Sequence, residues 1–351
     1  MDNQSDMVEH CSYCERQKLL DMLNEALLLI DACNYTVTFM NKKARVMYGY
    51  PNEEVKRLHV TDIDCNSAEA IIYGLELVKV DVNSSRIFTS SHRHKNGRIF
   101  KVQVSVNFIK FHGSETFVAI IRDMNPYLRL KEDVVKAERI QRKFLPPDID
   151  NEWTLMKSIY QPHGHISGDL YGYKWYKDDP ILFGYIIDVM GHGIATALQT
   201  ATLRVLFQQV SEMNIPLNEK LAWLNRNAAP YFVEDSFAAA ICFELDFSKQ
   251  RLSCSASGIN HFIISNSGKK KIVTIPGPFL GISEKVSFDT YEQNVKSGDY
   301  IFFFSDGLSG QIPDSSGSVA ANFESEYWKL ARLSASGVCV DDATAMCFYI
   351  K

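Results

Sequence analysis

The sequence IDVMGHGIATAL fills residues 187–198 and combines a strand end, a carboxylate, a tight turn and the start of a helix. The residues before it, 181–187, are an apolar run of strand length, and Asp188 stands where that run ends. Two glycines flank His192, which lets the backbone turn tightly and adopt positive φ. A carboxylate on such rigid support is the ligand type that hard divalent cations prefer. Taken alone, the stretch is equally compatible with a turn that its aspartate caps.

The size and composition indicate a folded protein of two domains. The chain has 351 residues, of which 46% are apolar and 23% charged. Its net charge of -5 gives no electrostatic case for a nucleic-acid partner. No apolar run reaches the roughly 18 residues that a membrane helix requires, and the acidic, polar N-terminus is unlike a secretory signal. We therefore expect a cytoplasmic protein with no nucleic-acid and no membrane partner.

The cysteines do not indicate a disulfide scaffold, because eight in a chain of this length are too few. Cys11 and Cys14 form one Cys-x-x-Cys pair, with His10 beside it and no second pair. A structural zinc site normally has four ligands, usually from two such pairs. We predict a frayed N-terminal segment over residues 1–18, with metal binding or redox chemistry at Cys11 and Cys14 as the alternative.

The first domain is predicted over residues 19–124. Residues 19–30 have the apolar spacing of an amphipathic helix, and residues 35–40 have the β-branched and aromatic composition of a strand. Two short helices are expected next. Three strand-like runs then close the domain, at residues 85–93, 98–108 and 116–122. The pair Asn96-Gly97 suits a tight hairpin turn between the first two of these runs.

This order of strand, short helices and three-stranded meander resembles a PAS sensor domain. The matching residues are Phe39-Met40-Asn41, Gly49-Tyr50, Glu53-Glu54-Val55, Asp62-Ile63, His94-Lys95-Asn96-Gly97 and Ile121-Arg122-Asp123. The resemblance implies a small cavity that holds haem, flavin, a metabolite or nothing. The chain has no Asn-Cys-Arg-Phe-like stretch for covalent flavin attachment. Haem would need His59, His92 or His94 as its ligand, and such histidines are more often at the surface or at a helix cap, so the ligand stays open.

A linker helix is predicted within residues 125–147. Asn125-Pro126 ends the preceding strand, and the helix stops at 145–147, Leu-Pro-Pro. Its apolar positions recur at spacings of three and four, as a two-helix seam requires. They are Leu130, Val134, Ala137, Ile140 (or Gln141) and Phe144. We expect a homodimer through this helix, the alternative being a helix packed on its own domain. A helix fixed at both ends can transmit a rotation or a register shift.

The second domain is predicted over residues 148–351, and acidic residues stand at its strand ends or turns in four places. They are Asp169, Asp188, Asp306 and the pair Asp341 and Asp342. If the strands share a sandwich core, these carboxylates converge at one edge, where they repel each other unless a cation neutralises them. Oxygen-only sites suit Mg²⁺ or Mn²⁺, and a paired site would support hydrolysis of a phosphoester. The alternative is four unrelated turn aspartates.

Seven short motifs follow one another along this part of the chain. They are Ala137-Glu138-Arg139-Ile140-Gln141, Ser167-Gly168-Asp169-Leu170-Tyr171, Asp188-Val189-Met190-Gly191-His192-Gly193, Ser257-Gly258 with His261, Pro276-Gly277-Pro278-Phe279-Leu280-Gly281, Ser305-Asp306-Gly307-Leu308, and Asp341-Asp342 with Thr344. In these motifs and their order, the chain from about residue 138 resembles the bacterial PPM-type (SpoIIE-like, protein phosphatase 2C-like) serine/threonine phosphatases, which include regulators of sigma-factor pathways. The resemblance implies an α/β/β/α sandwich, so the whole chain is expected to be an α+β protein.

The resemblance also implies a site for two Mn²⁺ or Mg²⁺ ions. Asp188 would bridge both ions, and the backbone carbonyl of Val189 would bind the second. Asp306 and Asp341 would complete the ligands of the first ion, and Asp169 would hold the second ion directly or through water. The nucleophile would be a metal-activated water, with Asp188 and Asp306 as the catalytic residues.

Three other positions affect what is expected of this metal site, namely Asp342, His192 and Gly172. By the resemblance, Asp342 hydrogen-bonds nearby rather than ligating, although the sequence does not decide between Asp341 and Asp342 as the ligand. His192 suits a role in the turn better than one as a general acid. The family usually has a further aspartate where this chain has Gly172, so the second ion is expected to bind more weakly. We expect that binding to stay weak until the linker helix orders the site.

These features predict a cytoplasmic, signal-regulated, metal-dependent phosphatase for phosphoserine or phosphothreonine. By the resemblance, its substrate is a phosphorylated STAS-domain anti-sigma-factor antagonist. One alternative is a non-catalytic signalling adaptor that retains the phosphatase fold, which the altered positions around Asp169 motivate. Another is a metal hydrolase of a small phosphoester. The sequence leaves open the signal, the direction of control and the particular substrate.

Overall fold

The chain folds into two compact units, residues 1–132 and residues 133–351. The computed structural model describes residues 17–351 except 81–84, 112, 177–178, 192, 233–235, 267–268, 284, 310–321, 337–338 and 340. The boundary between the units falls inside helix α6, Asn125–Arg142. Cys11, Cys14 and His192 lie outside the described residues. Across the described ranges, no helix combines the length and the apolar character needed to span a membrane.

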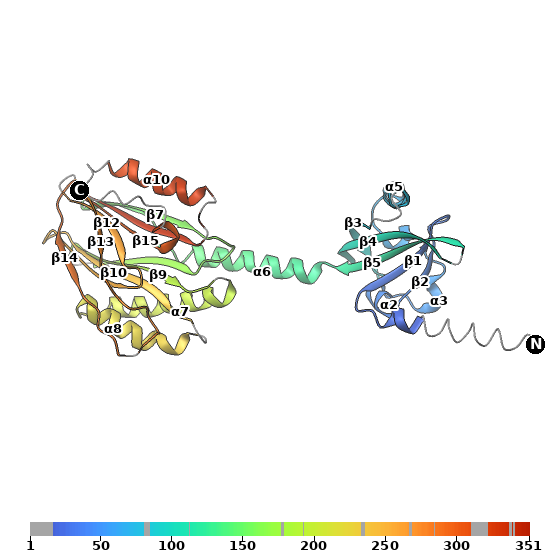
Figure 1. Ribbon diagram of the computed structural model, residues 1–351, viewed down its shortest axis with the longest axis horizontal. Helices are drawn as coiled ribbons and strands as arrows, with labels where there is room; N and C mark the ends of the chain where they lie inside the picture. The colour runs from blue at the N-terminus through green and yellow to red at the C-terminus, as the bar shows by residue number, and fades with distance from the viewer. Residues whose placement is uncertain are drawn as a thin grey trace, which may run out of the picture. The chain divides into compact units, whose positions relative to one another are not determined.

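The first unit is built on a five-stranded antiparallel sheet in the order β2-β1-β5-β4-β3 (Figure 1). The strands are β1 Ala26–Asp31, β2 Val37–Met40, β3 Arg86–Arg93, β4 Ile99–Phe111 and β5 Ser114–Asp123. Four helices stand between β2 and β3: α2 Lys42–Tyr48, α3 Asn52–Val55, α4 Val60–Ile63 and α5 Ala68–Lys79. The last three strands pair in sequence as a meander. The PAS-like order of strand, short helices and meander is therefore confirmed.

The helix expected over residues 19–30 is wrong beyond its first turn. Helix covers only residues 17–21 of the described chain there, and Ala26–Asp31 is the strand β1. This strand lies inside the sheet, paired with β2 on one side and β5 on the other. A short apolar run fits a buried strand as well as the apolar face of a helix, and here strand pairing on both sides decided the outcome.

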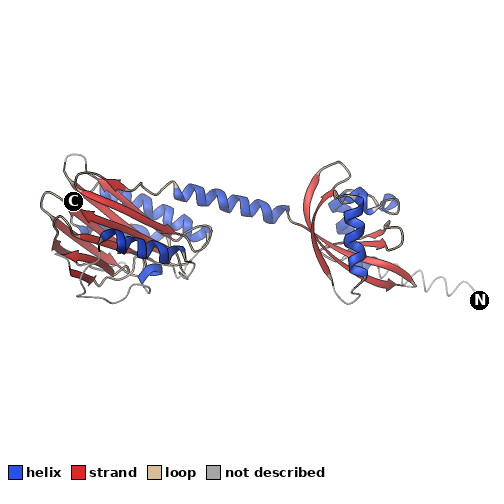
Figure 2. Ribbon diagram, turned by 90° about the horizontal axis from the view of Figure 1, so that it is seen from above, coloured by secondary structure: helices blue, strands red, loops and turns tan. Residues whose placement is uncertain are grey.

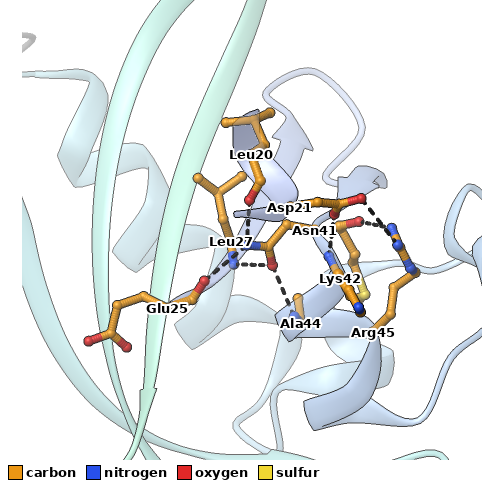
Figure 3. A network of polar contacts seen from close by, with 9 residues as sticks. Leu20, Asp21, Glu25, Leu27, Asn41, Lys42, Ala44 and Arg45 are labelled. Carbon is orange, nitrogen blue, oxygen red and sulfur yellow. Dashed lines mark hydrogen bonds and ion pairs between the residues drawn. The ribbon is translucent and has the colours of Figure 1, made fainter. Parts of the chain in front are cut away.

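Asn41 joins the start of β1 to the start of α2 (Figure 3). Its side chain is fully buried, and its Oδ1 accepts hydrogen bonds from the backbone N–H groups of Leu27 and Ala44, both at 2.9 Å. Its Nδ2 donates to the carbonyl oxygens of Leu20 at 3.0 Å and Glu25 at 2.9 Å. One side chain therefore caps α2 and satisfies three backbone groups of the preceding segment.

The second unit is an α/β/β/α sandwich, as the sequence predicts (Figures 1 and 2). One sheet has the order β14-β11-β10-β9-β8 and the other has the order β13-β12-β15-β16-β7-β6. The first sheet comprises β8 Asp169–Trp175, β9 Ile181–Val189, β10 Ala238–Asp246, β11 Arg251–Ser257 and β14 Tyr291–Asn294. The second comprises β6 Ile149–Asp150, β7 Thr154–Gln161, β12 His261–Asn266, β13 Lys269–Thr274, β15 Tyr300–Phe304 and β16 Ala343–Ile350.

Helices cover both outer faces of the sandwich. Helices α7, Ile194–Ser211, and α8, Leu217–Ala228, pack against the first sheet, and the short helix η1, Ala229–Tyr231, follows α8. Helix α10, Phe323–Ala335, packs against the second sheet, and α9, Asp306–Ser309, follows β15. Between the sheets, the Phe243 ring of β10 stacks on the Phe303 ring of β15 with centroids 4.0 Å apart. This aromatic core holds the sheets in one relative position, and with them the strand ends described next.

Candidate metal centre and active site

Two pairs of neighbouring strands bring the predicted acidic residues to one edge of the sandwich. In the first sheet, β8 and β9 are antiparallel and place Asp169 opposite Asp188. In the second sheet, β15 ends two residues before Asp306, and its partner β16 begins two residues after Asp341. Antiparallel pairing puts the end of one strand beside the start of the next, so pairing alone places these carboxylates in two groups.

Three of these carboxylates border one cavity of about 350 Å³. They are Asp188, Asp306 and Asp341. The rest of the wall is largely apolar and includes the rings of Phe237 and Phe279, which lie 4.7 Å apart between centroids. A few polar groups beside mostly apolar side chains are the usual composition of a ligand pocket.

Burial and neighbouring charge raise the pKa values of two carboxylates of this cavity. Burial together with the nearby charges of Asp306 and Asp341 raises the pKa of Asp188 to about 7. Burial and the charge of Asp341 likewise raise the pKa of Asp306. Each effect disfavours the charged form of the carboxyl group. A bound divalent cation reverses this balance by supplying the opposite charge.

Asp169 lies behind the cavity and is almost completely buried, with 1% of its surface exposed. Its Oδ2 accepts a hydrogen bond from Ser305 Oγ at 2.6 Å, which links β8 to the end of β15. Its Oδ1 is buried without a hydrogen-bond partner among the described residues. Burial and the charge of Asp188 raise the pKa of Asp169 well above its usual value. Burying a carboxylate oxygen without a hydrogen-bond donor costs free energy. A bound cation or an ordered water would offset that cost.

Asp342 differs from Asp341 because its carboxylate accepts hydrogen bonds from two backbone N–H groups of the fold. Its Oδ1 accepts from the backbone N–H of His163 at 2.7 Å, and its Oδ2 accepts from that of Gly168 at 2.6 Å. Asp342 is buried, whereas Asp341 is exposed and borders the cavity. The hydrogen-bonding role expected for Asp342 is therefore confirmed, and Asp341 is the member of the pair that faces the cavity.

Two glycines permit the close backbone approach that the site needs. A Cβ at Gly168 would stand 2.8 Å from the carbonyl oxygen of Val189, so the end of β9 lies close to the backbone there. A Cβ at Gly307 would stand 2.0 Å from the carbonyl oxygen of Asp342. The residue after Asp306 must therefore be glycine for the two acid-bearing segments of the second sheet to lie this close.

Comparison with known proteins shows what this unit is similar to. Residues 181–338 match the family model "Stage II sporulation protein E (SpoIIE)". The second unit, residues 133–351, is therefore similar to the SpoIIE family over these residues and is termed the SpoIIE-type unit. The SpoIIE-type unit also shares its fold with the SiaA-PP2C domain of Pseudomonas aeruginosa, at a TM-score of 0.52 and 15% identity, covering 65% of this chain and 99% of that domain.

Two curated relatives come from Bacillus subtilis (strain 168). The chain is 29% identical over 187 residues to "Phosphoserine phosphatase RsbP", which covers 52% of this chain and 46% of RsbP. It is 24% identical over 183 residues to "Phosphoserine phosphatase RsbU", which covers 51% of this chain and 54% of RsbU. The chain thus spans about half the length of the curated relatives it matches.

A residue of the SpoIIE-type unit that the sequence interpretation missed is Gln141, at the end of α6. Its Nε2 donates to the carbonyl oxygen of Ser167 at 2.7 Å, and its Oε1 accepts from the N–H of Ser167 at 3.0 Å. Thr200 of α7 donates to the next carbonyl, that of Gly168, at 2.9 Å. Gln141 was considered as an alternative position in a helix seam and as part of the motif 137–141, but no contact with Ser167 was predicted for it. The sequence did contain a signal for another role. The motif 137–141 ends in a glutamine, whereas a helix seam favours apolar residues.

The donor set fits a hard divalent cation. All four acidic groups supply oxygen, and Asp169 Oδ1 has no hydrogen-bond donor among the described residues. Within the described part of the chain, no three His, Cys, Asp or Glu side chains are already grouped as a ready metal site. A bound cation would offset the repulsion that raises the pKa values of Asp188 and Asp306.

Proposed function

We propose that the SpoIIE-type unit is a metal-dependent phosphatase that removes phosphate from phosphoserine or phosphothreonine in a protein. Asp169, Asp188, Asp306, Asp341 and the backbone carbonyl of Val189 would hold two Mn²⁺ or Mg²⁺ ions. The observation that carries the proposal is the convergence of Asp188, Asp306 and Asp341 on one cavity, where the pKa values of Asp188 and Asp306 are raised. The names of RsbP and RsbU as phosphoserine phosphatases support it.

The chain's own residues have distinct roles in this reaction. Bound divalent cations would supply an activated water and neutralise charge on the phosphoryl group. Asp188 and Asp306 present their carboxylates to the cavity in which the phosphoryl group would bind. Ser305 is a positioning residue, since its hydroxyl holds Asp169 Oδ2 at 2.6 Å. The rings of Phe237 and Phe279 form an apolar wall that limits the access of water.

The finer assignment is a phosphorylated STAS-domain anti-sigma-factor antagonist as the substrate, in the cytoplasm. We also propose a homodimer through α6. The exposed apolar side chains of this helix support the dimer, because Tyr127 is 60%, Leu130 58% and Ile140 55% exposed. A helix packed on its own domain would bury such side chains.

Regulation through α6 is part of the same proposal. The two hydrogen bonds between Gln141 and Ser167 attach the end of α6 two residues before Asp169. A rotation or shift of the helix would therefore move the segment that carries this carboxylate. A signal received by the PAS-like unit would act on metal binding by this route.

The test is phosphate release by the full-length chain with Mn²⁺, with Mg²⁺ and with a chelator. Substrates are p-nitrophenyl phosphate and a phosphoserine protein, and the variants are Asp188→Asn and Asp306→Asn. The matched control is Asp289→Asn, an exposed aspartate outside the cavity. We expect metal-dependent release that both site variants lose and the control keeps.

The outcomes separate the alternatives. Release from neither substrate with either metal would reject the enzyme and favour a signalling adaptor that keeps the fold. A strong preference for the small substrate over the phosphoprotein would favour a hydrolase of small phosphoesters.

A further inference from the structure

The first unit contains a cavity of about 160 Å³ on the helical side of its sheet. Helix α5 contributes Gly74 and Leu75, and the sheet contributes apolar side chains such as Val104 and Ile121. One part of the wall is polar and is made by Asp64, Asn66, Ser90 and His92. The cavity is thus apolar except at one end, which is the arrangement that orients a small ligand.

The volume sets the size of that ligand. An apolar cavity of about 150 Å³ in another protein binds benzene, so this cavity holds about one aromatic ring. Pockets for drug-sized ligands measure about 300–1,000 Å³, so haem and flavin are too large. The rings of the three histidines considered for haem are also engaged. His92 Nδ1 lies 2.6 Å from Tyr48 Oη, His59 Nδ1 lies 2.8 Å from Thr61 Oγ1, and His94 Nδ1 accepts from Asn96 N–H at 3.1 Å.

The polar end of the cavity contains an incompletely used acceptor, which is Oδ2 of Asp64. Asp64 Oδ1 accepts from the N–H of Asn66 at 3.0 Å and from Ser90 Oγ at 2.8 Å. The partner of Oδ2 is His92 Nε2 at 3.5 Å, which is too long for a strong hydrogen bond. A carboxylate oxygen can accept two donors, so Oδ2 has capacity for a donor from a ligand.

The charge of Asp64 limits which ligand charges the cavity can accommodate. Burial alone would favour the neutral acid, but the contacts with His92, Asn66 and Ser90 outweigh it and lower the pKa of Asp64. The carboxylate is therefore ionised at neutral pH. An anion beside it would be repelled in a mostly apolar surrounding, and a cationic ligand would lose its hydration there. A neutral molecule avoids both costs.

We propose that this cavity is a binding site for a neutral molecule of single-ring size that carries one hydrogen-bond donor, such as a phenol. The apolar walls enclose the ring, and the donor contacts Asp64 Oδ2. Neutral rings without a donor bind more weakly, and ring carboxylates are excluded. This site is independent of the proposed phosphatase activity.

The first experiment compares three single-ring probes on the full-length chain by isothermal titration calorimetry. The probes are phenol, toluene and benzoate. We expect phenol to bind at least tenfold more tightly than toluene, and benzoate not to bind detectably. Benzoate binding as tight as that of phenol would overturn the proposal, and so would the absence of phenol binding.

Variants then locate the binding to this cavity. Gly74→Leu would fill it, since a Cβ at Gly74 meets nothing closer than 3.7 Å, at the Phe88 ring. The matched control is Ala68→Leu, which places the same leucine side chain at an exposed position of α5 outside the cavity. We expect the first variant to lose phenol binding and the second to keep it. Equal binding by both variants would place phenol elsewhere and refute the site.

A third variant tests the acceptor itself without depending on a bulky substitution. Asp64→Asn removes the charge while keeping the shape of the side chain. We expect it to weaken phenol binding about tenfold and to reduce the discrimination against benzoate. The control is Glu69→Gln, an exposed carboxylate of α5 that does not line the cavity. Unchanged selectivity in Asp64→Asn would show that this carboxylate does not recognise the ligand.

Discussion

Asp341 and Asp342 are adjacent in the sequence, and the structure predicts opposite effects for the same substitution at each. In Asp342→Asn, one carboxylate oxygen becomes an NH₂ group, which would face the N–H of either His163 or Gly168. Those N–H groups now donate at 2.7 Å and 2.6 Å to a side chain that is 5% exposed. A hydrogen bond to a charged group contributes about 1.5–3 kcal/mol, so we expect the free energy of unfolding to fall by about 2–3 kcal/mol.

The matched variant is Asp341→Asn. Asp341 is exposed, and its Oδ1 accepts from the N–H of Asp342 at 2.8 Å, a bond that asparagine can keep. The substitution also removes a negative charge that raises the pKa values of Asp188 and Asp306. We therefore expect the free energy of unfolding of the metal-free protein to be unchanged or slightly higher. The ability of Mn²⁺ to stabilise the fold should be lost.

The assay is urea unfolding of the full-length chain in chelator, followed by tryptophan fluorescence. All four tryptophans lie in the second unit, so the signal reports on that unit alone. They are Trp153, Trp175, Trp223 and Trp328. The same measurement in excess Mn²⁺ gives the metal-dependent stabilisation. An unchanged midpoint in Asp342→Asn, together with a large loss in Asp341→Asn, would refute this assignment of roles.

Three further predictions use the same unfolding assay. Gly307→Ala should lower stability by about 1–3 kcal/mol and weaken Mn²⁺ binding, because its Cβ would stand 2.0 Å from the carbonyl oxygen of Asp342. A pKa of Asp188 raised from 3.8 to about 7 means that the metal-free protein loses roughly 4 kcal/mol of stability as pH rises from about 4 to about 7, because only the folded state still holds the proton in that range. Asp188→Asn should therefore unfold like the native chain at pH 4 and be more stable at pH 8, and equal stability at both pH values would contradict the repulsion. Gln141→Glu should cost about 1–3 kcal/mol, because a carboxylate would replace the amide that donates to Ser167 at 2.7 Å, whereas no loss would show that this contact is dispensable.

Local signals were enough to predict most of the second unit. At residues 300–307, an apolar run followed by Asp and Gly predicts both a buried strand and the acidic residue at its end. Glycine at 168 and 307 marks where two backbones lie close together. The α/β/β/α sandwich was implied by the family resemblance, and the PAS-like order of elements followed from these patterns together with a resemblance. Such features are visible in one sequence because each depends on residues only a few positions apart.

Contacts between distant segments decided what the sequence left open. Whether residues 26–31 form a helix or a strand depended on pairing with strands up to 95 residues away, as between Ala26 and Ile121. The different roles of Asp341 and Asp342 depended on the N–H of Gly168, which is 174 residues from Asp342 in the chain. Gln141 looked like part of a helix seam until its bonds to Ser167 were seen.

The sequence by itself determined which residue types stand at the strand ends, and therefore the chemistry that this edge of the sandwich can perform. Only the tertiary structure decided which carboxylates face the cavity, which are used to hold the backbone, and how large the cavity of the first unit is. The physical reason is that hydrogen bonding and burial depend on the atoms that surround a side chain. Those atoms come from segments that only the folded chain brings together.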